Sequence, residues 1–245
     1  MDIVTKPTGQ TMGELVKEYK ANHPDVKKAC FCGRLDPMAR GQVLLLLNNN
    51  CKKMPDYLNK DKVYQFEIVL GFQTDTDDFM GLCNYVDREY DFNKIKKQII
   101  KYINKYKGKE FDQKFHNYST KRITNPDFIL KPTEFYMVEE YHKVKIYDIK
   151  HIEDKEYNYK LWREKNINIV KNVTGEFRQQ QICDNWSSID YNENINSIKF
   201  EIKVSSGFYI RQFVRDISDH IQFPLLTFDI NRIKILTVDT HKKYI

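Results

Sequence analysis

Residues 33–41 read Gly-Arg-Leu-Asp-Pro-Met-Ala-Arg-Gly, and the apolar run Val43–Leu47 follows almost at once. The run has the length and the continuous apolar character of a strand that is buried on both faces. Asp36 precedes a proline, which favours an extended backbone, and the two glycines permit a tight loop. We therefore expect a loop that presents the Asp36 carboxylate above a buried strand. An Asp-Pro pair is also a common turn, so the loop alone leaves a purely structural role open.

Helix and strand patterns alternate irregularly along the rest of the chain. Thr11 and Glu14 form a capping-box pattern, which predicts a helix over residues 12–20. Further helices are expected over 51–59, 92–106 and 209–220, and strands over 43–47, 63–71, 198–204 and 230–238. Strand-like alternation also occurs in 135–149, whereas the polar stretch 151–195 has no clear pattern. Because strands and helices do not follow a strict βαβ order, we expect an α+β fold.

The composition excludes several classes of protein. The chain has 245 residues, and its 15 Phe and 16 Tyr can supply a sizeable core, which argues against disorder. Its mean hydropathy is −0.65, and it lacks an apolar run near the roughly 20 residues that a membrane-spanning helix needs. The 40 Lys and Arg against 34 Asp and Glu give a net charge of +6, which is compatible with a nucleic-acid partner without requiring one. Without a repeat or a flexible linker, we expect a single domain over residues 1–245.

Cysteine usage and the first residues bear on compartment and cofactors. The five cysteines are an odd number, which points to reduced thiols in a cytosol-like compartment. Cys30-Phe31-Cys32 lacks a second Cys or His pair at a zinc-like spacing, so no metal site is expected. The N-terminus shows neither a basic leader nor an apolar core, which favours a cytoplasmic protein. The glycine-rich loops of nucleotide and nicotinamide sites are absent, so no cofactor is expected.

Three aspartates, Asp75, Asp77 and Asp78, follow the strand expected over 63–71. They suggest a calcium loop at first sight. The sixth position of an EF-hand loop would be Met80 instead of glycine, however, and the twelfth would be Val86 instead of glutamate. We therefore expect a polar turn, with a metal-dependent nuclease as a distant alternative that EDTA would test.

Glycine is scarce, and its placement is informative. Seven of the nine glycines fall in four short segments, where the backbone must bend sharply or approach something closely. The last segment reads Ser205-Ser-Gly-Phe-Tyr-Ile-Arg211, in which a strand ends, Gly207 turns the chain and Arg211 enters the first turn of a helix. An arginine there can pair with a carboxylate through two parallel hydrogen bonds, or it can simply lie on the surface.

Together these segments resemble the TruB family of RNA pseudouridine synthases. The resemblance rests on Lys6-Pro-Thr-Gly-Gln-Thr11, Gly33-Arg-Leu-Asp-Pro-Met-Ala-Arg-Gly41, Lys62-Val-Tyr64, Gly71 through Thr74-Asp-Thr-Asp77, and Gly207-Phe-Tyr-Ile-Arg211, in that order. It implies an α+β catalytic fold with a mixed, bent central β-sheet flanked by helices. It also implies a cofactor-free enzyme that acts on the T-loop uridine of tRNA, position 55 in tRNA numbering.

The resemblance assigns roles residue by residue. Asp36 takes the position of the catalytic aspartate, Tyr64 that of the active-site tyrosine, and Arg211 that of the arginine that pairs with the aspartate. Residues expected to contact RNA are Lys6, Phe31, Arg34, Lys62, Tyr209 and Leu226. For the lysines and Arg34, ordinary surface charge is an equally good interpretation.

Three departures from the family pattern are visible. Phe31 stands where many members carry a histidine that helps to flip the target base. The chain ends soon after Arg211, so we expect no C-terminal PUA domain and therefore a stand-alone, monomeric enzyme that works without guide RNA. The family's central segment is matched only loosely, by Asn117-Tyr-Ser-Thr-Lys121.

The expected chemistry needs few groups. Pseudouridine formation breaks the N1–C1′ bond of uridine, turns the base and rejoins it through C5, so all atoms are conserved. Positive charge develops at C1′, where a carboxylate can capture or stabilise it. Uracil leaves as a delocalised anion, so Asp36 suffices without a second acid, while Tyr64 can stack on the extruded base.

Two further functions stay open at this stage. One is a non-catalytic RNA-binding or tRNA-folding protein on the same fold, and the other is the same chemistry on another structured RNA. A pseudouridine map of RNA incubated with the protein distinguishes them.

Overall fold

The computed structural model describes residues 1–87, 89–116, 118 and 140–236. These residues form one eight-stranded sheet in the order β1-β3-β10-β4-β9-β8-β7, with β2 also paired to β3. The strands are β1 Asp2–Lys6, β2 Ala29–Cys32, β3 Arg40–Leu47, β4 Asp61–Leu70, β7 Glu110–Lys114, β8 Tyr141–Asn158, β9 Asn194–Val204 and β10 Leu225–Leu236. Within this sheet β10 pairs with β3 in parallel, and the other described neighbours are antiparallel. The sheet is therefore mixed, as predicted.

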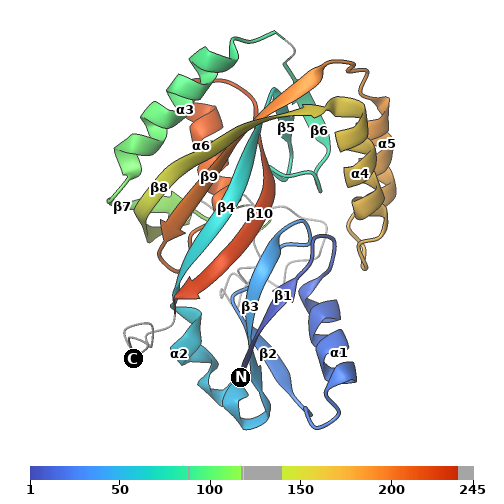
Figure 1. Cartoon of the computed structure of the whole chain (residues 1–245), viewed down its shortest axis with the longest axis vertical. Helices are drawn as coiled ribbons and strands as arrows, with labels where there is room; N and C mark the ends of the chain where they lie inside the picture. The colour runs from blue at the N-terminus through green and yellow to red at the C-terminus, as the bar shows by residue number, and fades with distance from the viewer. Residues whose placement is uncertain (88, 117, 119–139, 237–245) are drawn as a thin grey trace.

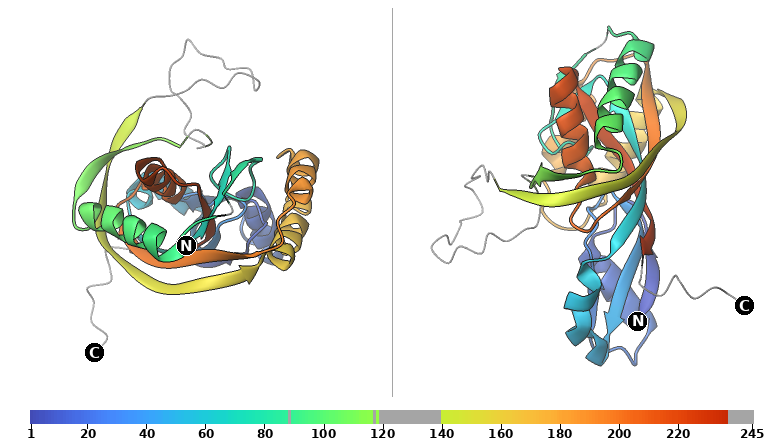
Figure 2. Two further views of the ribbon diagram at one scale, coloured as in Figure 1. Left: turned by 90° about the horizontal axis from the view of Figure 1, so that it is seen from above. Right: turned by 90° about the vertical axis from the view of Figure 1, so that its left-hand side faces the viewer.

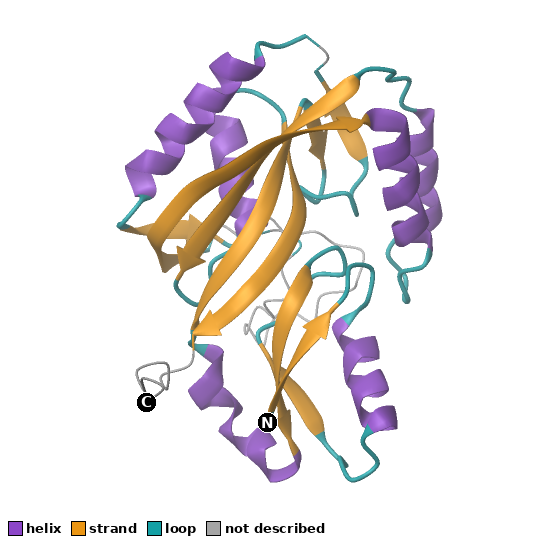
Figure 3. Ribbon diagram, in the orientation of Figure 1, coloured by secondary structure: helices purple, strands orange, loops and turns teal. Residues whose placement is uncertain are grey.

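Helices flank the strands (Figure 3). They are α1 Met12–Asn22, α2 Met54–Leu58 after the 3₁₀ turn Asn48–Lys53, α3 Phe92–Tyr106, α4 Tyr159–Lys171, α5 Gln179–Ser188 and α6 Ile210–Ile221. Helices α1 and α2 accompany β1–β3 at one end of the molecule, and the other helices lie at the opposite end (Figure 1). A separate hairpin joins β5 Phe72–Thr74 to β6 Cys83–Val86.

The long strands β8 and β9 bend around α6 and the β5–β6 hairpin (Figure 2, left). Helix α3 lies at one end of this arc, and α4 and α5 lie at the other end. The buried apolar residues form two large clusters. In one, residues of α1, α3 and α6 pack against the sheet, and the second contains aromatic residues of α4, α5 and β5. The α+β class and the bent central sheet are thus confirmed.

Most local predictions are confirmed. Helix α1 begins with the predicted capping box, since the Thr11 hydroxyl accepts from the Glu14 amide at 3.2 Å and the Glu14 carboxylate accepts from the Thr11 amide at 2.8 Å. Strand β3 is buried along Val43–Leu46, as its apolar run predicted. Strand β10 begins at Leu225, five residues earlier than predicted, because Leu225–Phe228 already pair with β4.

The stretch 151–195, which gave no clear pattern, contains the end of β8, α4, α5 and the start of β9. Part of the strand expected over 135–149 lies outside the described residues, as does most of the loosely matched segment 117–121. Among the described helices, none is long and apolar enough to cross a membrane. All five cysteines are free.

Candidate active site

The Asp36 loop, residues 33–39, connects β2 to β3, and its first residues accept hydrogen bonds from Arg232 of β10. This arginine is buried, and its guanidinium donates to the carbonyl of Gly33 at 3.0 Å and to that of Arg34 at 3.4 Å. Its Nε also donates to the Gln42 carbonyl at 2.6 Å. The start of the loop therefore takes its hydrogen bonds from a side chain about two hundred residues away, because a loop cannot satisfy its own carbonyls as a helix does.

Lys6, at the end of β1, fastens the other half of the loop. Its ammonium is fully buried and donates to the carbonyls of Ala39 at 2.6 Å, Pro37 at 3.1 Å and Pro7 at 3.0 Å. Burial lowers the pKa of Lys6 to about 8, against the opposing effect of Asp36. The prediction that Lys6 contacts RNA is wrong for this structure, because its ammonium faces three backbone carbonyls instead of solvent.

Asp36 in this loop forms an ion pair with Arg211. The Arg211 Nη2 lies 2.8 Å from Asp36 Oδ2, and the two side chains are 8% and 37% exposed. Burial by itself would lower the pKa of Arg211, but the surrounding carboxylates, Asp36 foremost, raise it above its ordinary value. A permanent positive charge thus lies against a carboxylate that remains open to solvent on its other side.

The polar turn after β5 also holds the Arg211 guanidinium. Arg211 Nη1 donates to the Thr76 carbonyl at 2.9 Å and lies 3.5 Å from Asp78 Oδ2. Asp78 is buried, which raises the pKa of its carboxyl, while Arg211 opposes that rise. Its neighbour Asp77 pairs with Arg215 at 2.8 Å. The turn was predicted, but its burial against Arg211 was not.

Tyr64 of β4 lies near the Asp36–Arg211 pair. It lines a cavity of about 860 Å³, the Tyr64 cavity, together with Asp36, Tyr209, Arg211 and Ile230. The structure therefore brings together the three side chains assigned from sequence to catalysis. Among the described residues, no group of three or more His, Cys, Asp or Glu side chains is arranged to hold a metal ion.

Residues 20–169 match the family described as TruB family pseudouridylate synthase (N terminal domain). The chain belongs to the TruB family. It is 28% identical over 232 residues to the tRNA pseudouridine synthase B of Mesoplasma florum, covering 95% of this chain and 67% of that protein. It is 30% identical over 216 residues to the protein of the same name from Mycoplasma mycoides subsp. mycoides, covering 88% of this chain and 60% of that protein.

A solved structure supports the fold. The chain in the "Crystal Structure of a Cbf5-Nop10-Gar1 Complex" superposes with a TM-score of 0.54 at 16% identity, covering 95% of this chain and 48% of that chain. At this identity the likeness concerns the fold alone. Compared with these proteins, the present chain spans between about half and two thirds of their length.

Four further residues were expected from the TruB resemblance to contact RNA, namely Phe31, Arg34, Lys62 and Tyr209. Arg34 is exposed, with its guanidinium carbon 5.6 Å from the centre of the Phe31 ring. Tyr209 lies at the N-terminus of α6 and lines the Tyr64 cavity. Lys62 lines the same cavity, but burial lowers its pKa to about 8 and it donates to the Leu58 carbonyl at 3.2 Å. For these four residues, contact with RNA stays a prediction.

Leu226 is the second correction. It is completely buried in the aromatic cluster of α4, α5 and β5, so the prediction that it contacts RNA is wrong for this structure. The β10 residues that line the Tyr64 cavity are Ile230 and Arg232. The register of β10 against β4 shifts between Phe228 and Asn231, which redirects the side chains beyond that point. Such a bulge leaves no clear signal in the sequence.

Sequence reasoning also missed Asp78 and Arg232. The Asp cluster was expected to be a polar turn, and Arg232 was not among the candidate residues. Their position around Arg211 and the Asp36 loop follows from strand pairings between distant segments. Arg232 shares its strand with Asp229, Asn231 and Lys234, so no local pattern marks it as a buried charge.

Proposed function

We propose that this chain converts uridine to pseudouridine in RNA, and that its target is the T-loop uridine at position 55 of tRNA. The observation that carries the proposal is the 2.8 Å pair between Asp36 and Arg211 at the wall of the Tyr64 cavity. Membership of the TruB family and relatives named tRNA pseudouridine synthase B support the same reaction and the same RNA.

In the proposed reaction, Asp36 acts at C1′ of the target nucleotide. Its Oδ2 pairs with Arg211, which leaves Oδ1 to approach C1′. The N1–C1′ bond breaks with its electron pair on the uracil, and the carboxylate captures or stabilises the positive C1′. The base turns, C5 bonds to C1′, and C5 then loses its proton while N1 gains one. Atoms and electrons balance without a second substrate.

Tyr64 holds the base during this turn. Its ring lies in the cavity wall, where it can stack on the extruded uracil, and its hydroxyl is the group assigned to receive the C5 proton. The T arm of tRNA as the docking element, action as a monomer without guide RNA, and a cytoplasmic location, which the free thiols favour, belong to the same proposal.

The decisive experiment is the substitution Asp36→Asn, assayed with a T-arm stem-loop that carries uridine tritiated at C5. We expect tritium release to disappear, because the amide cannot stabilise positive C1′, while RNA affinity stays within about threefold, less than 1 kcal/mol. Asp25→Asn, at an exposed carboxylate of another loop, is the matched control and should release tritium at the native rate. Full activity of Asp36→Asn would refute the assignment.

A further inference from the structure

The turn that leads into α6 is bound along its length by the paired strands β7 and β8. This turn, residues 205–209, lies between the end of β9 and the start of α6, and we name it the α6 turn. At its first residue, the Ser205 amide donates to the Lys145 carbonyl at 3.0 Å, and the Lys145 amide donates to the Ser205 hydroxyl at 2.8 Å. Side chains of the same two strands bind the later residues of the turn.

Gln113 of β7 binds both backbone groups of Tyr209, the last residue of the α6 turn. Its Oε1 accepts a hydrogen bond from the Tyr209 amide at 2.9 Å, and its Nε2 donates to the Tyr209 carbonyl at 3.0 Å. Gln113 is only 1% exposed, and Tyr209 is the N-cap residue of α6. One buried side-chain amide therefore fixes the backbone at the point where α6 begins, as a paired strand would.

His142 of β8 binds the same turn beside Gln113. The two residues are opposite each other in the β7–β8 register, so their side chains lie on the same face of the strands. His142 Nε2 donates to the Gly207 carbonyl at 2.9 Å. Gly207 has a φ of +85°, and a Cβ there would lie 3.3 Å from the His142 ring, so the ring packs directly on the glycine backbone.

The Tyr209 side chain is bound as well as its backbone. Phe115 and His142 stack with their ring centres 4.1 Å apart, and the Tyr209 ring lies edge-on to both, at 5.9 Å from Phe115 and 5.7 Å from His142. Edge-to-face contacts at such separations are favourable and depend on orientation. The position of the Tyr209 ring is therefore set by the same pair of strands.

Small displacements of Tyr209 would reach the proposed active site. Tyr209 lines the Tyr64 cavity, and Arg211, two residues later in the first turn of α6, pairs with Asp36 at 2.8 Å. Gln113 is not among the described residues that line this cavity. Any effect of Gln113 on the reaction is therefore indirect. A displacement of about 1 Å at a reacting group can slow a reaction about 100-fold.

We propose that Gln113 is a positioning residue for pseudouridine formation, which holds the start of α6 so that Tyr209 and Arg211 face the target uridine. His142 supports the same turn from the neighbouring strand. The role requires a side chain that accepts and donates a hydrogen bond at once, as an amide does. This inference rests on the proposed function, because it concerns the geometry of the same site.

The first test is Gln113→Met, which keeps the length of the side chain and removes both hydrogen bonds. We expect the single-turnover rate constant of tritium release, at saturating T-arm stem-loop, to fall roughly 10- to 100-fold. A variant that merely folds less well loses amplitude, because fewer molecules react, but the folded molecules keep the native rate constant. A native rate constant in Gln113→Met would overturn the proposal.

Asn185→Leu is the matched control. Asn185 of α5 also binds both backbone groups of one residue, since it accepts from the Cys83 amide at 2.7 Å and donates to the Cys83 carbonyl at 3.2 Å. Neither residue is among those that line the Tyr64 cavity. We expect Asn185→Leu to lower the melting temperature, as Gln113→Met does, and to keep the native rate constant.

Gln113→Glu tests the same contact through the pH. A protonated glutamic acid accepts and donates as the amide does, whereas its carboxylate only accepts and repels the Tyr209 carbonyl. Burial raises the pKa of a carboxyl group, so we expect the rate constant to lie within about threefold of the native value at about pH 5.5 and to fall about tenfold below it at about pH 8. A ratio to the native protein that is below one and constant with pH would overturn the proposal.

The native protein at each pH is the reference because other titratable groups lie nearby. His142 of β8 and Tyr209 at the start of α6 face residue 113, and both are present in the two proteins. Asp112 and Lys114 flank it in β7, where alternation directs their side chains to the opposite face. The substitution therefore adds one titratable group to an otherwise common set.

Hydrogen exchange measures the contact without turnover. Since the Tyr209 amide donates to Gln113, we expect it to exchange about tenfold faster in Gln113→Met and at the native rate in Asn185→Leu. Unchanged exchange in Gln113→Met would overturn the proposal. If Asp36→Asn keeps native activity while Gln113→Met exchanges faster and turns over more slowly, the positioning role stands and only the chemistry assigned to Asp36 fails.

Discussion

At the scale of single residues, the direction of the Asp36 carboxylate is set by groups other than Asp36 itself. Arg211 holds it at 2.8 Å, and the Thr76 carbonyl and Asp78 in turn hold the guanidinium at 2.9 and 3.5 Å. A guanidinium bound on several sides has one orientation, and a carboxylate paired with it inherits that orientation. The proposed catalytic group is therefore positioned before any RNA arrives.

Tyr64 permits a test at the same scale. Tyr64→Phe keeps the ring that stacks on the base and removes the hydroxyl assigned to the C5 proton. We expect RNA affinity to stay near that of the native protein, while single-turnover tritium release slows about 100-fold, the usual contribution of a general base. Tyr85→Phe, at an exposed tyrosine, is the control. Equal rates for the two variants would show that the hydroxyl transfers no proton.

At the scale of elements, the Asp36 loop depends on two strands that border it. Lys6 at the end of β1 and Arg232 in β10 donate to four of its carbonyls, those of Gly33, Arg34, Pro37 and Ala39. A surface loop would leave these carbonyls to water, but here both cations are buried. The loop is thereby rigid at both ends without regular secondary structure of its own.

Lys6→Met tests this fastening. Methionine fills similar space but donates no hydrogen bond, so the buried Ala39 carbonyl and the part-buried carbonyls of Pro7 and Pro37 lose their partner. We expect the free energy of unfolding in urea to fall by about 3 kcal/mol, given about 1–3 kcal/mol for a buried group left unsatisfied. Lys17→Met, at an exposed lysine of α1, should change it by less than about 0.5 kcal/mol. A Lys6→Met protein as stable as Lys17→Met would contradict the proposed role.

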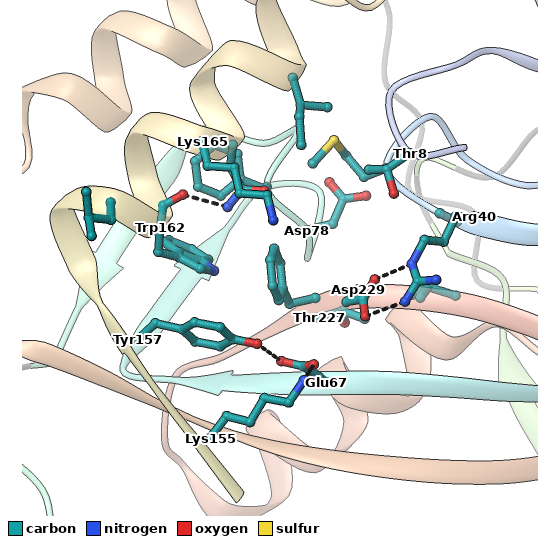
Figure 4. Close-up of a pocket in the computed structure, with 18 of the residues that line it drawn as sticks. Thr8, Arg40, Glu67, Asp78, Lys155, Tyr157, Trp162, Lys165, Thr227 and Asp229 are labelled. Atoms are coloured by element: carbon teal, nitrogen blue, oxygen red, sulfur yellow. Dashed lines mark hydrogen bonds and ion pairs between the residues drawn. The ribbon is translucent and has the colours of Figure 1, made fainter. Parts of the chain in front are cut away.

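At the scale of the whole molecule, the sheet brings together segments that are far apart in the chain. Parallel pairing places Asn231 opposite Arg40 and Arg232 opposite Gly41, and antiparallel pairing places β4 between β10 and β9. Asp36 before β3, Tyr64 in β4 and Arg211 after β9 converge for this reason. Residues of α4 and of the Asp36 loop also line one cavity (Figure 4).

The stability of the whole molecule should depend on the pH through Asp216 of α6. Burial, with Asp219 and Asp77 nearby, raises the pKa of Asp216 to about 6, and Gln212 and Arg215 oppose that rise. A carboxyl with a higher pKa in the folded than in the unfolded state binds more protons when folded, so its stabilising effect is complete below about pH 4 and is lost as the pH rises through 6.

Asp216→Asn removes this dependence and keeps an acceptor for Gln212, which donates to Asp216 at 2.8 Å. We expect the variant to equal the native protein at pH 4 and to exceed it by about 2 kcal/mol at pH 7.5, measured as free energy of unfolding in urea. The same difference at both pH values would refute the role of Asp216 ionisation.

The helices over 12–20 and 92–106, the strand over 63–71 and the loop around Asp36 followed from sequence, because capping, periodicity and turn chemistry act between near neighbours. The roles of Asp36, Tyr64 and Arg211 came from the resemblance to the TruB family. Lys6 and Leu226 show the limit of such reasoning, since a motif lysine and a strand leucine look the same in sequence whether they face RNA or the interior.

By itself, then, the sequence determined the α+β class, the family and the identity of the three central side chains. Only the tertiary structure decided that Lys6 and Arg232 hold the Asp36 loop, that Asp78 lies under Arg211, and that Ile230 instead of Leu226 faces the cavity. The physical reason is that burial of a charge and the facing of a strand residue depend on partners supplied by distant strands and on a β-bulge. Local patterns in the chain carry no record of these.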